Sequence, residues 1–231
     1  MMELEKRERA GSNERKSIAS YKPLLGLLAI PAFNFFYGLQ NHSGEHVQSL
    51  VTDVDRNTPF IPGFVVPYML WYPFLILVFF LVLRKDKTKY YRLLLALCLG
   101  LFLSNVVYLF FQTTVPRPAV DSTGFFNNLV SIVYANDEPY NCFPSIHVMS
   151  SMLMIYGVQA LRWRVRIPLA LFALTIIVST LFVKQHVIAD LLAGMLLAKF
   201  TFWLAGEWLP VILRRRALIK SARGASHADY K

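Results

Sequence analysis

Residues 185–206 read QHVIADLLAGMLLAKFTFWLAG, a segment in which a histidine and an aspartate introduce a long apolar run. Such a run can cross the roughly 30 Å of hydrocarbon in a bilayer as a helix. Comparable runs recur along the chain, near 23–40, 62–83, 93–112, 145–161, 167–185 and 187–206. We therefore predict an all-α integral membrane protein with six transmembrane helices in a bundle.

The composition supports a membrane protein. The 231 residues are 55% hydrophobic, and 16% are charged, against about 25% in ordinary soluble domains. We expect one membrane domain over 23–213, a polar cytoplasmic tail over 1–22 and a basic cytoplasmic tail over 214–231. The first tail carries charges of both signs and lacks the short apolar core of a signal peptide, so we expect it to stay on the protein.

Most of the positive charges fall on one side of the predicted spans. Twenty of the 24 Lys and Arg residues lie in four segments, 1–22, 84–92, 162–166 and 214–231. These segments are the tails and alternate loops of a six-span chain, so the positive-inside rule places both termini in the cytoplasm. The net charge of +10 then reflects topology and contact with anionic lipid headgroups, and we expect no nucleic-acid partner.

This topology brings the polar residues of three distant segments to the outer face. The fourth and sixth spans, starting near Pro144 and His186, both run inward, so their amino-terminal N–H groups face outward. Helix amino termini of this kind favour an anion such as phosphate.

His186 and Asp190 are four residues apart, which places them on one face of a helix. A carboxylate there can fix the imidazole tautomer and leave the second ring nitrogen free to attack. Ser145 and His147 begin a different helix and can approach the same bound group. Arg117 lies between two prolines, and its planar guanidinium suits phosphate oxygens.

Three motifs carry a family resemblance. PRP (116–118), FPSIH (143–147) and STLFVKQHVIAD (179–190) resemble the phosphatase motifs of the type 2 phosphatidic acid phosphatase superfamily, a group of membrane lipid phosphatases and phosphotransferases. The resemblance implies a six-helix core and a site without metal or other cofactor, facing away from the cytoplasm.

The same resemblance implies residue roles. His186 would attack phosphorus and become a phosphohistidine, with Asp190 orienting it. His147 would protonate the leaving group, while Arg117 and Ser145 would hold the phosphate oxygens.

Two positions depart from the family pattern. Phe110 stands where a lysine is usual, and Thr180 where an arginine is usual. The missing cations resemble the inositol phosphorylceramide synthase and sphingomyelin synthase branch, which transfers a phosphate-linked headgroup between lipids.

Three functions therefore stay open. The first is a metal-independent phosphatase that hydrolyses a lipid phosphate or diphosphate, with a phospholipid or isoprenoid phosphate as substrate, in the plasma membrane if the source is bacterial. The second is a lipid phosphotransferase using an acceptor hydroxyl. The third is a non-catalytic lipid-binding or scrambling relative.

Lys184, Asn141 and Asp137 are secondary candidates for substrate contact, although an interfacial charge, a turn or a helix cap explains them equally well. A zinc site is the chemical rival. His42 and His46 would form an i,i+4 pair if their loop were helical, and His147 or His186 could complete the site. Ser, Gly, Asp and Asn in residues 41–58 argue against that helix, so we predict no metal. The oligomeric state is left open.

Overall fold

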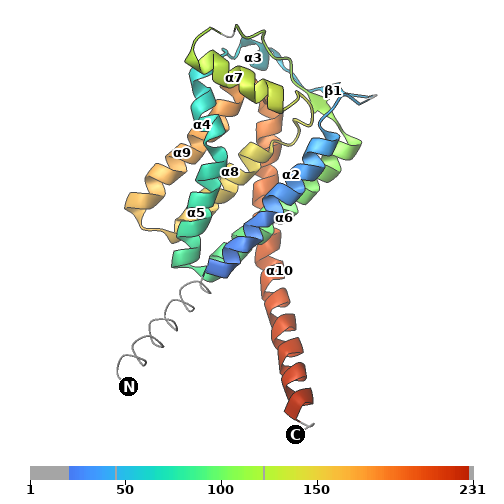
Figure 1. The fold of residues 1–231 in the computed structure, drawn as a ribbon, viewed down its shortest axis with the longest axis vertical. Coiled ribbons are helices and arrows are strands. Elements are labelled where there is room, and N and C mark those ends of the chain that lie inside the picture. The colour runs from blue at the N-terminus through green and yellow to red at the C-terminus, as the bar shows by residue number, and fades with distance from the viewer. Residues whose placement is uncertain (1–20, 45, 122, 229–231) are drawn as a thin grey trace, which may run out of the picture.

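The computed structural model describes residues 21–44, 46–121 and 123–228, and they form a helical bundle (Figure 1). Five helical segments are long and apolar enough to cross a membrane. They are Lys22–Gln40 (η1, Lys22–Leu28, and α2, Ala29–Gln40), Pro62–Lys85 (η2, Pro62–Phe64; α4, Val65–Met69; α5, Trp71–Lys85), α6 (Lys87–Phe110), α9 (Trp163–Phe182) and Ile188–Arg215, the apolar part of α10 (Ile188–Ala228).

The fourth predicted span forms a shorter apolar helix, Ile146–Ala160, made of α8 (Ile146–Gly157) and η3 (Val158–Ala160). The all-α class is thus confirmed, and five of the six runs have membrane-spanning length. The count of six spans and the cytoplasmic position of the termini stay predictions, as do the domain limits. Most of the tail predicted over 1–22 lies outside the described residues, and α10 continues without a break through position 213.

The shortness of α8 follows from its place in the bundle. It packs against α5, α6, α9 and α10 and lies in the middle of the bundle (Figure 1). Met149, Leu153 and Met154 are fully buried. A helix that is apolar on all sides is one surrounded by protein.

The short elements gather at one end of the bundle. β1 (Gln48–Ser49) pairs in parallel with β2 (Thr113–Thr114), and α3 (Asp53–Asn57) and α7 (Phe125–Asn136) lie nearby. Figure 1 shows this end opposite the end where η1 begins and α10 extends away. All three motifs lie at or beneath the end that carries these loops.

Gly194 brings the starts of α8 and α10 together. A Cβ atom at this position would lie 2.8 Å from the carbonyl oxygen of Ser145 and 3.2 Å from the backbone nitrogen of Met149. Backbone atoms this close leave room only for glycine. The second and third motifs therefore meet because α10 has no side chain at this point.

Candidate active site

His186 lies in the turn before α10, which begins at Ile188. His186 and Asp190 therefore do not stack along one helix face as predicted. Instead the Asp190 carboxylate, in the first turn of α10, reaches back to the His186 ring. Asp190 Oδ2 lies 3.3 Å from His186 Nδ1 and accepts a hydrogen bond from the Val187 N–H at 2.9 Å. Asp190 is fully buried and His186 is 8% exposed. A carboxylate on Nδ1 leaves Nε2 as the free ring nitrogen.

The turn before His186 is held by the end of α9. The N–H groups of Gln185 and His186 both donate to the Thr180 carbonyl, at 3.0 and 3.2 Å. Lys184 adopts a left-handed backbone conformation, with φ of 54°. Its Nζ donates to the carbonyls of Asp55 (2.8 Å) and Thr58 (2.5 Å). Lys184 thus binds the loop above the site, which accounts for its charge without a phosphate.

Asp55 is a residue of this site that sequence reasoning missed. Its Oδ1 accepts from the Ile188 N–H at 2.9 Å, so a carboxylate from α3 caps the first turn of α10. Its Oδ2 closes a capping box with Thr52. The Thr-x-x-Asp spacing of residues 52–55 was the available signal, but it does not reveal the contact with α10.

The hydrogen bonds to Asp55 also set its pKa. Burial alone would raise the pKa of this carboxyl. Hydrogen bonds from Thr52 and from the Ile188 N–H, with the nearby Lys184 charge, outweigh burial and lower the pKa below its ordinary value of 3.8. Asp55 is therefore ionised at neutral pH.

His147 lies in an aromatic slot at the start of α8. Its ring centroid is 4.5 Å from that of Tyr68 and 4.1 Å from that of Trp71, and 5.9 Å from that of His186. Trp71 is itself fixed by a hydrogen bond from Nε1 to Ser150 Oγ at 2.8 Å. His147 Nδ1 is buried and has no hydrogen-bond partner among the described residues. Trp71 is thus fixed beside the ring of His147 and helps to position it.

Ser145 caps α8. Its side chain is fully buried, and its Oγ accepts from the Val148 N–H at 3.3 Å. At α10, the N–H groups of Val187 and Ile188 donate to the carboxylates of Asp190 and Asp55. The prediction that these helix starts offer free N–H groups to phosphate is therefore wrong for these three donors, because side-chain oxygens occupy them.

Arg117 is half-buried against α7 and the turn before His186. It donates to the Asp137 carbonyl at 2.6 Å and to the Gln185 side chain, and its guanidinium lies 4.5 Å from the centre of the Tyr134 ring. These contacts fix the Arg117 guanidinium and leave its buried Nε–H without a partner among the described residues.

The two remaining candidates, Asp137 and Asn141, form hydrogen bonds between loops and neighbouring segments. The Asp137 carboxylate accepts from Tyr37 Oη at 2.7 Å and from Asn41 Nδ2 at 2.9 Å. Asn141, at φ of 56°, accepts from Gln112 at 3.2 Å. Its Nδ2 is buried without a partner among the described residues, which leaves a donor for a ligand.

Two cavities meet at His186. The first, of about 450 Å³, is here named the aromatic cavity and is lined by Tyr37, Tyr68, Trp71, Tyr72, Asp137, Asn141, His147, Gln185 and His186, among others. The second, of about 400 Å³, is named the loop cavity and is lined by residues that include Asp55, Arg117, Lys184 and His186. Among the described residues, His186 alone lines both.

The positions of the two missing cations do not face either cavity. Phe110 ends α6 and is 85% exposed. Thr180 is fully buried, and its Oγ1 donates to the Ile177 carbonyl at 2.7 Å. The cations that do line a cavity among the described residues, Arg56, Arg117 and Lys184, all line the loop cavity.

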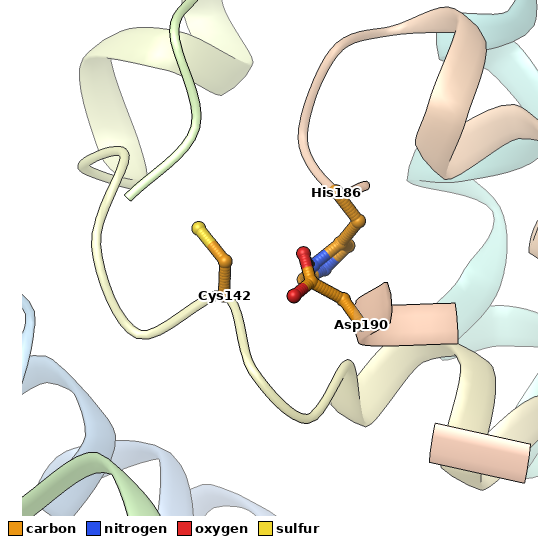
Figure 2. A group of neighbouring side chains, drawn as sticks. All are labelled: Cys142, His186 and Asp190. Carbon is orange, nitrogen blue, oxygen red and sulfur yellow. Dashed lines mark hydrogen bonds and ion pairs between the residues drawn. The ribbon is translucent and has the colours of Figure 1, made fainter. Parts of the chain in front are cut away.

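The residues that could hold a metal differ from those considered in the sequence. His42 and His46 lie outside any helix, as predicted for this segment, so they do not form an i,i+4 pair. Cys142, His186 and Asp190 instead place one donor atom each within 4.8 Å of one another, and Figure 2 shows Cys142 on a loop that lies across from His186 and Asp190. Burial, with the Asp190 charge nearby, raises the pKa of the Cys142 thiol well above its ordinary value. Metals bind the thiolate, so a metal at this set would have to displace the Cys142 proton.

A family model described as the PAP2 superfamily matches residues 47–204, which contain all three motifs. The chain belongs to the PAP2 superfamily. Members of this superfamily are generally phosphatases or phosphotransferases, so membership supports an enzyme of that type in a membrane. The searches of curated proteins and of solved structures gave no match. The resemblance to the sphingolipid synthase branch stays a prediction.

Proposed function

We propose that this chain is a metal-independent lipid phosphatase that works through a phosphohistidine. One observation carries the proposal: His147 and His186 line the same cavity with ring centroids 5.9 Å apart, and a buried aspartate lies behind His186. Paired imidazoles with one oriented carboxylate are suited to nucleophilic attack and proton transfer across one phosphoryl group.

The chemistry follows from these positions. His186 Nε2 attacks phosphorus, a P–N bond forms, and the bond to the leaving oxygen breaks. His147 gives its proton to that oxygen, while Asp190 stabilises the charge that develops on the His186 ring. Water then attacks the phosphohistidine with His147 as base, the P–N bond breaks, and inorganic phosphate leaves. Acid–base help of this kind contributes about 10²–10⁴ in rate.

Phosphate binding in this proposal relies on few groups. Arg117 offers its charge and the free Nε, and Asn141 offers its free amide. Electrostatic stabilisation of the equatorial oxygens is a major part of catalysis in phosphoryl transfer. The substrate would be a lipid phosphate or diphosphate, on a phospholipid or an isoprenoid.

We place this chemistry at the extracytoplasmic face. The support is the charge pattern, since the basic segments 84–92 and 162–166 connect helices at their ends remote from the motifs. The positive-inside rule assigns such segments to the cytoplasm.

A phosphotransferase is the second candidate, and the two cavities favour it. Because the aromatic cavity and the loop cavity both reach His186, a lipid donor and an acceptor hydroxyl could approach from different sides. In that case the acceptor replaces water in the second step, and the same residues serve.

The experiment combines purified protein with a panel of lipid phosphates, lipid diphosphates and phosphodiester lipids, with and without EDTA. Free phosphate without any new phospholipid supports the phosphatase, and a new phospholipid product supports the transferase. Loss of activity in EDTA, restored by zinc, would contradict the metal-free mechanism. Folded protein that binds lipid but turns over none of the panel would favour the non-catalytic relative.

A further inference from the structure

An apolar groove of about 570 Å³ lies between the first span and α5. It is here named the α2–α5 groove, and residues lining it include Leu24, Leu28 and Ile30 from the first span and Leu75 and Ile76 from α5. No charged residue lines it within the described part of the chain. The lining is therefore better matched to hydrocarbon than to a charged headgroup.

The first span is the most weakly packed of the long helices. Among its described residues, Ile30 alone is buried, and Leu25 and Leu28 are 66% and 64% exposed. Its extensive contacts are with α6 rather than with α5, and Figure 1 shows α2 lying across α6. The groove is therefore open along the side of the bundle, where a lipid can enter from the bilayer.

The groove borders the aromatic cavity at two residues. Asn34 and Tyr72 line both spaces, and the Asn34 amide donates a hydrogen bond to the Tyr72 hydroxyl. The Tyr72 ring lies 4.2 Å from that of Trp71, which in turn contacts His147. A polar side chain within an apolar span is energetically costly, and a hydrogen bond between helices offsets that cost. The need for such a bond does not explain why this one lies where the groove and the aromatic cavity meet.

We propose that the α2–α5 groove binds the hydrocarbon tail of the lipid substrate, and that Asn34 and Tyr72 form the passage between tail and headgroup. The 14 residues from Tyr21 to Asn34 span about 20–25 Å, since Lys22–Leu28 is a 3₁₀-helix and the rest is α-helix. That length exceeds one leaflet of hydrocarbon, about 15 Å. A lipid in this position would reach His147 and His186 with its phosphate while its tail stays parallel to α2. This inference rests on the proposed function, because it places the substrate of the same site.

Chain-length selectivity tests the proposal. Ile76→Trp fills the groove, whereas Leu77→Trp, on the next residue of α5, adds the same side chain at an exposed position outside the groove. The readout is the ratio of kcat/KM for a long-chain lipid phosphate to that for a dihexanoyl lipid phosphate in the same detergent. We expect Ile76→Trp to lower this ratio at least tenfold and Leu77→Trp to change it less than twofold. Equal ratios in both variants would overturn the proposal.

A binding measurement separates this inference from the proposed function. A long-chain lipid phosphate with a diazirine near the end of its tail is photolysed with the whole protein, and the labelled peptides are mapped. We expect label on η1, α2 and α5 that excess unlabelled long-chain lipid phosphate displaces and phosphatidylcholine does not. Label that neither lipid displaces, or that both displace equally, would show ordinary bilayer lipid in the groove and overturn the inference. If the label behaves as expected while the wild type hydrolyses no lipid phosphate, the phosphatase proposal fails and the binding site stands.

Discussion

The backbone N–H of Ser145 donates to the carbonyl oxygen of Asp190 at 3.2 Å, so the second and third motifs are joined through the main chain. This bond forms where Gly194 lets α10 approach α8. The distance between His147 and His186 therefore depends on backbone packing as well as on side chains.

We expect Gly194→Ala to destabilise the protein and lower activity together. The new Cβ would meet backbone atoms of Ser145 and Met149, which cannot move aside as a side-chain end can. Overpacking of this kind typically costs about 1–3 kcal/mol. Thermal unfolding in detergent measures the stability. Gly63→Ala is the control, since a Cβ at Gly63 has nothing within 4 Å; equal melting temperatures for the two variants would contradict the packing argument.

Asp55→Ala should weaken the start of α10. Loss of a helix cap typically costs about 0.5–2 kcal/mol. Here the Asp55 carboxylate accepts from the Ile188 N–H, and the Asp55 backbone carbonyl accepts from Lys184 Nζ. Asp53→Ala is the matched control, because the Asp53 side chain is 99% exposed. The stability of both variants is measured by thermal unfolding at pH 7, where only Asp55→Ala should differ from the wild type.

The contribution of Asp55 should depend on pH with a defined sign. Because its folded pKa lies below the ordinary value of 3.8, the stabilisation is present above pH 3.8. It is lost as the pH falls through the lowered folded pKa. The difference in melting temperature between wild type and Asp55→Asn should therefore shrink below about pH 4. A difference that grows on acidification would contradict this assignment.

Arg117→Lys should lower kcat/KM by about 10- to 100-fold, since loss of one or two charge-assisted hydrogen bonds costs about 1.5–3 kcal/mol. Lysine keeps the charge but cannot contact Asp137 and Gln185 and lie over Tyr134 at once. Steady-state kinetics measure the effect. Arg84→Lys is the control, because Arg84 lies near the carboxyl end of α5, remote from the site. Full activity in Arg117→Lys would show that a point charge is sufficient.

Restoring the two usual family cations should not restore a stronger phosphate site. Phe110→Lys should fold and leave kcat/KM within about twofold, because position 110 is exposed at the end of α6 and surface changes are usually small. Thr180→Arg should fold poorly, because an unpaired buried charge costs about 3–5 kcal/mol. Yield of folded protein and phosphate release measure the two effects. A several-fold gain in phosphate release by Thr180→Arg would show that this position reaches the substrate.

The sequence predicts the helical class and the elements of the site, but not their contacts. Long apolar runs identify helices because hydrocarbon imposes a minimum length, and α8 is short because protein rather than lipid surrounds it. The four-residue spacing of His186 and Asp190 correctly predicts their proximity, although the aspartate reaches back over a turn instead of along a helix. Asp55 lies 133 residues before its partner Ile188, and no local pattern encodes a contact of that range. Tyr68 and Trp71 are similarly hidden, because aromatic residues are common throughout this chain.

The most direct test is a quench experiment with a lipid phosphate carrying ³²P in its phosphoryl group. The account predicts acid-labile, alkali-stable label on the peptide that contains His186, with no label and no turnover in His186→Ala of unchanged melting temperature. Label or substantial turnover in folded His186→Ala would contradict the assignment of His186 as nucleophile.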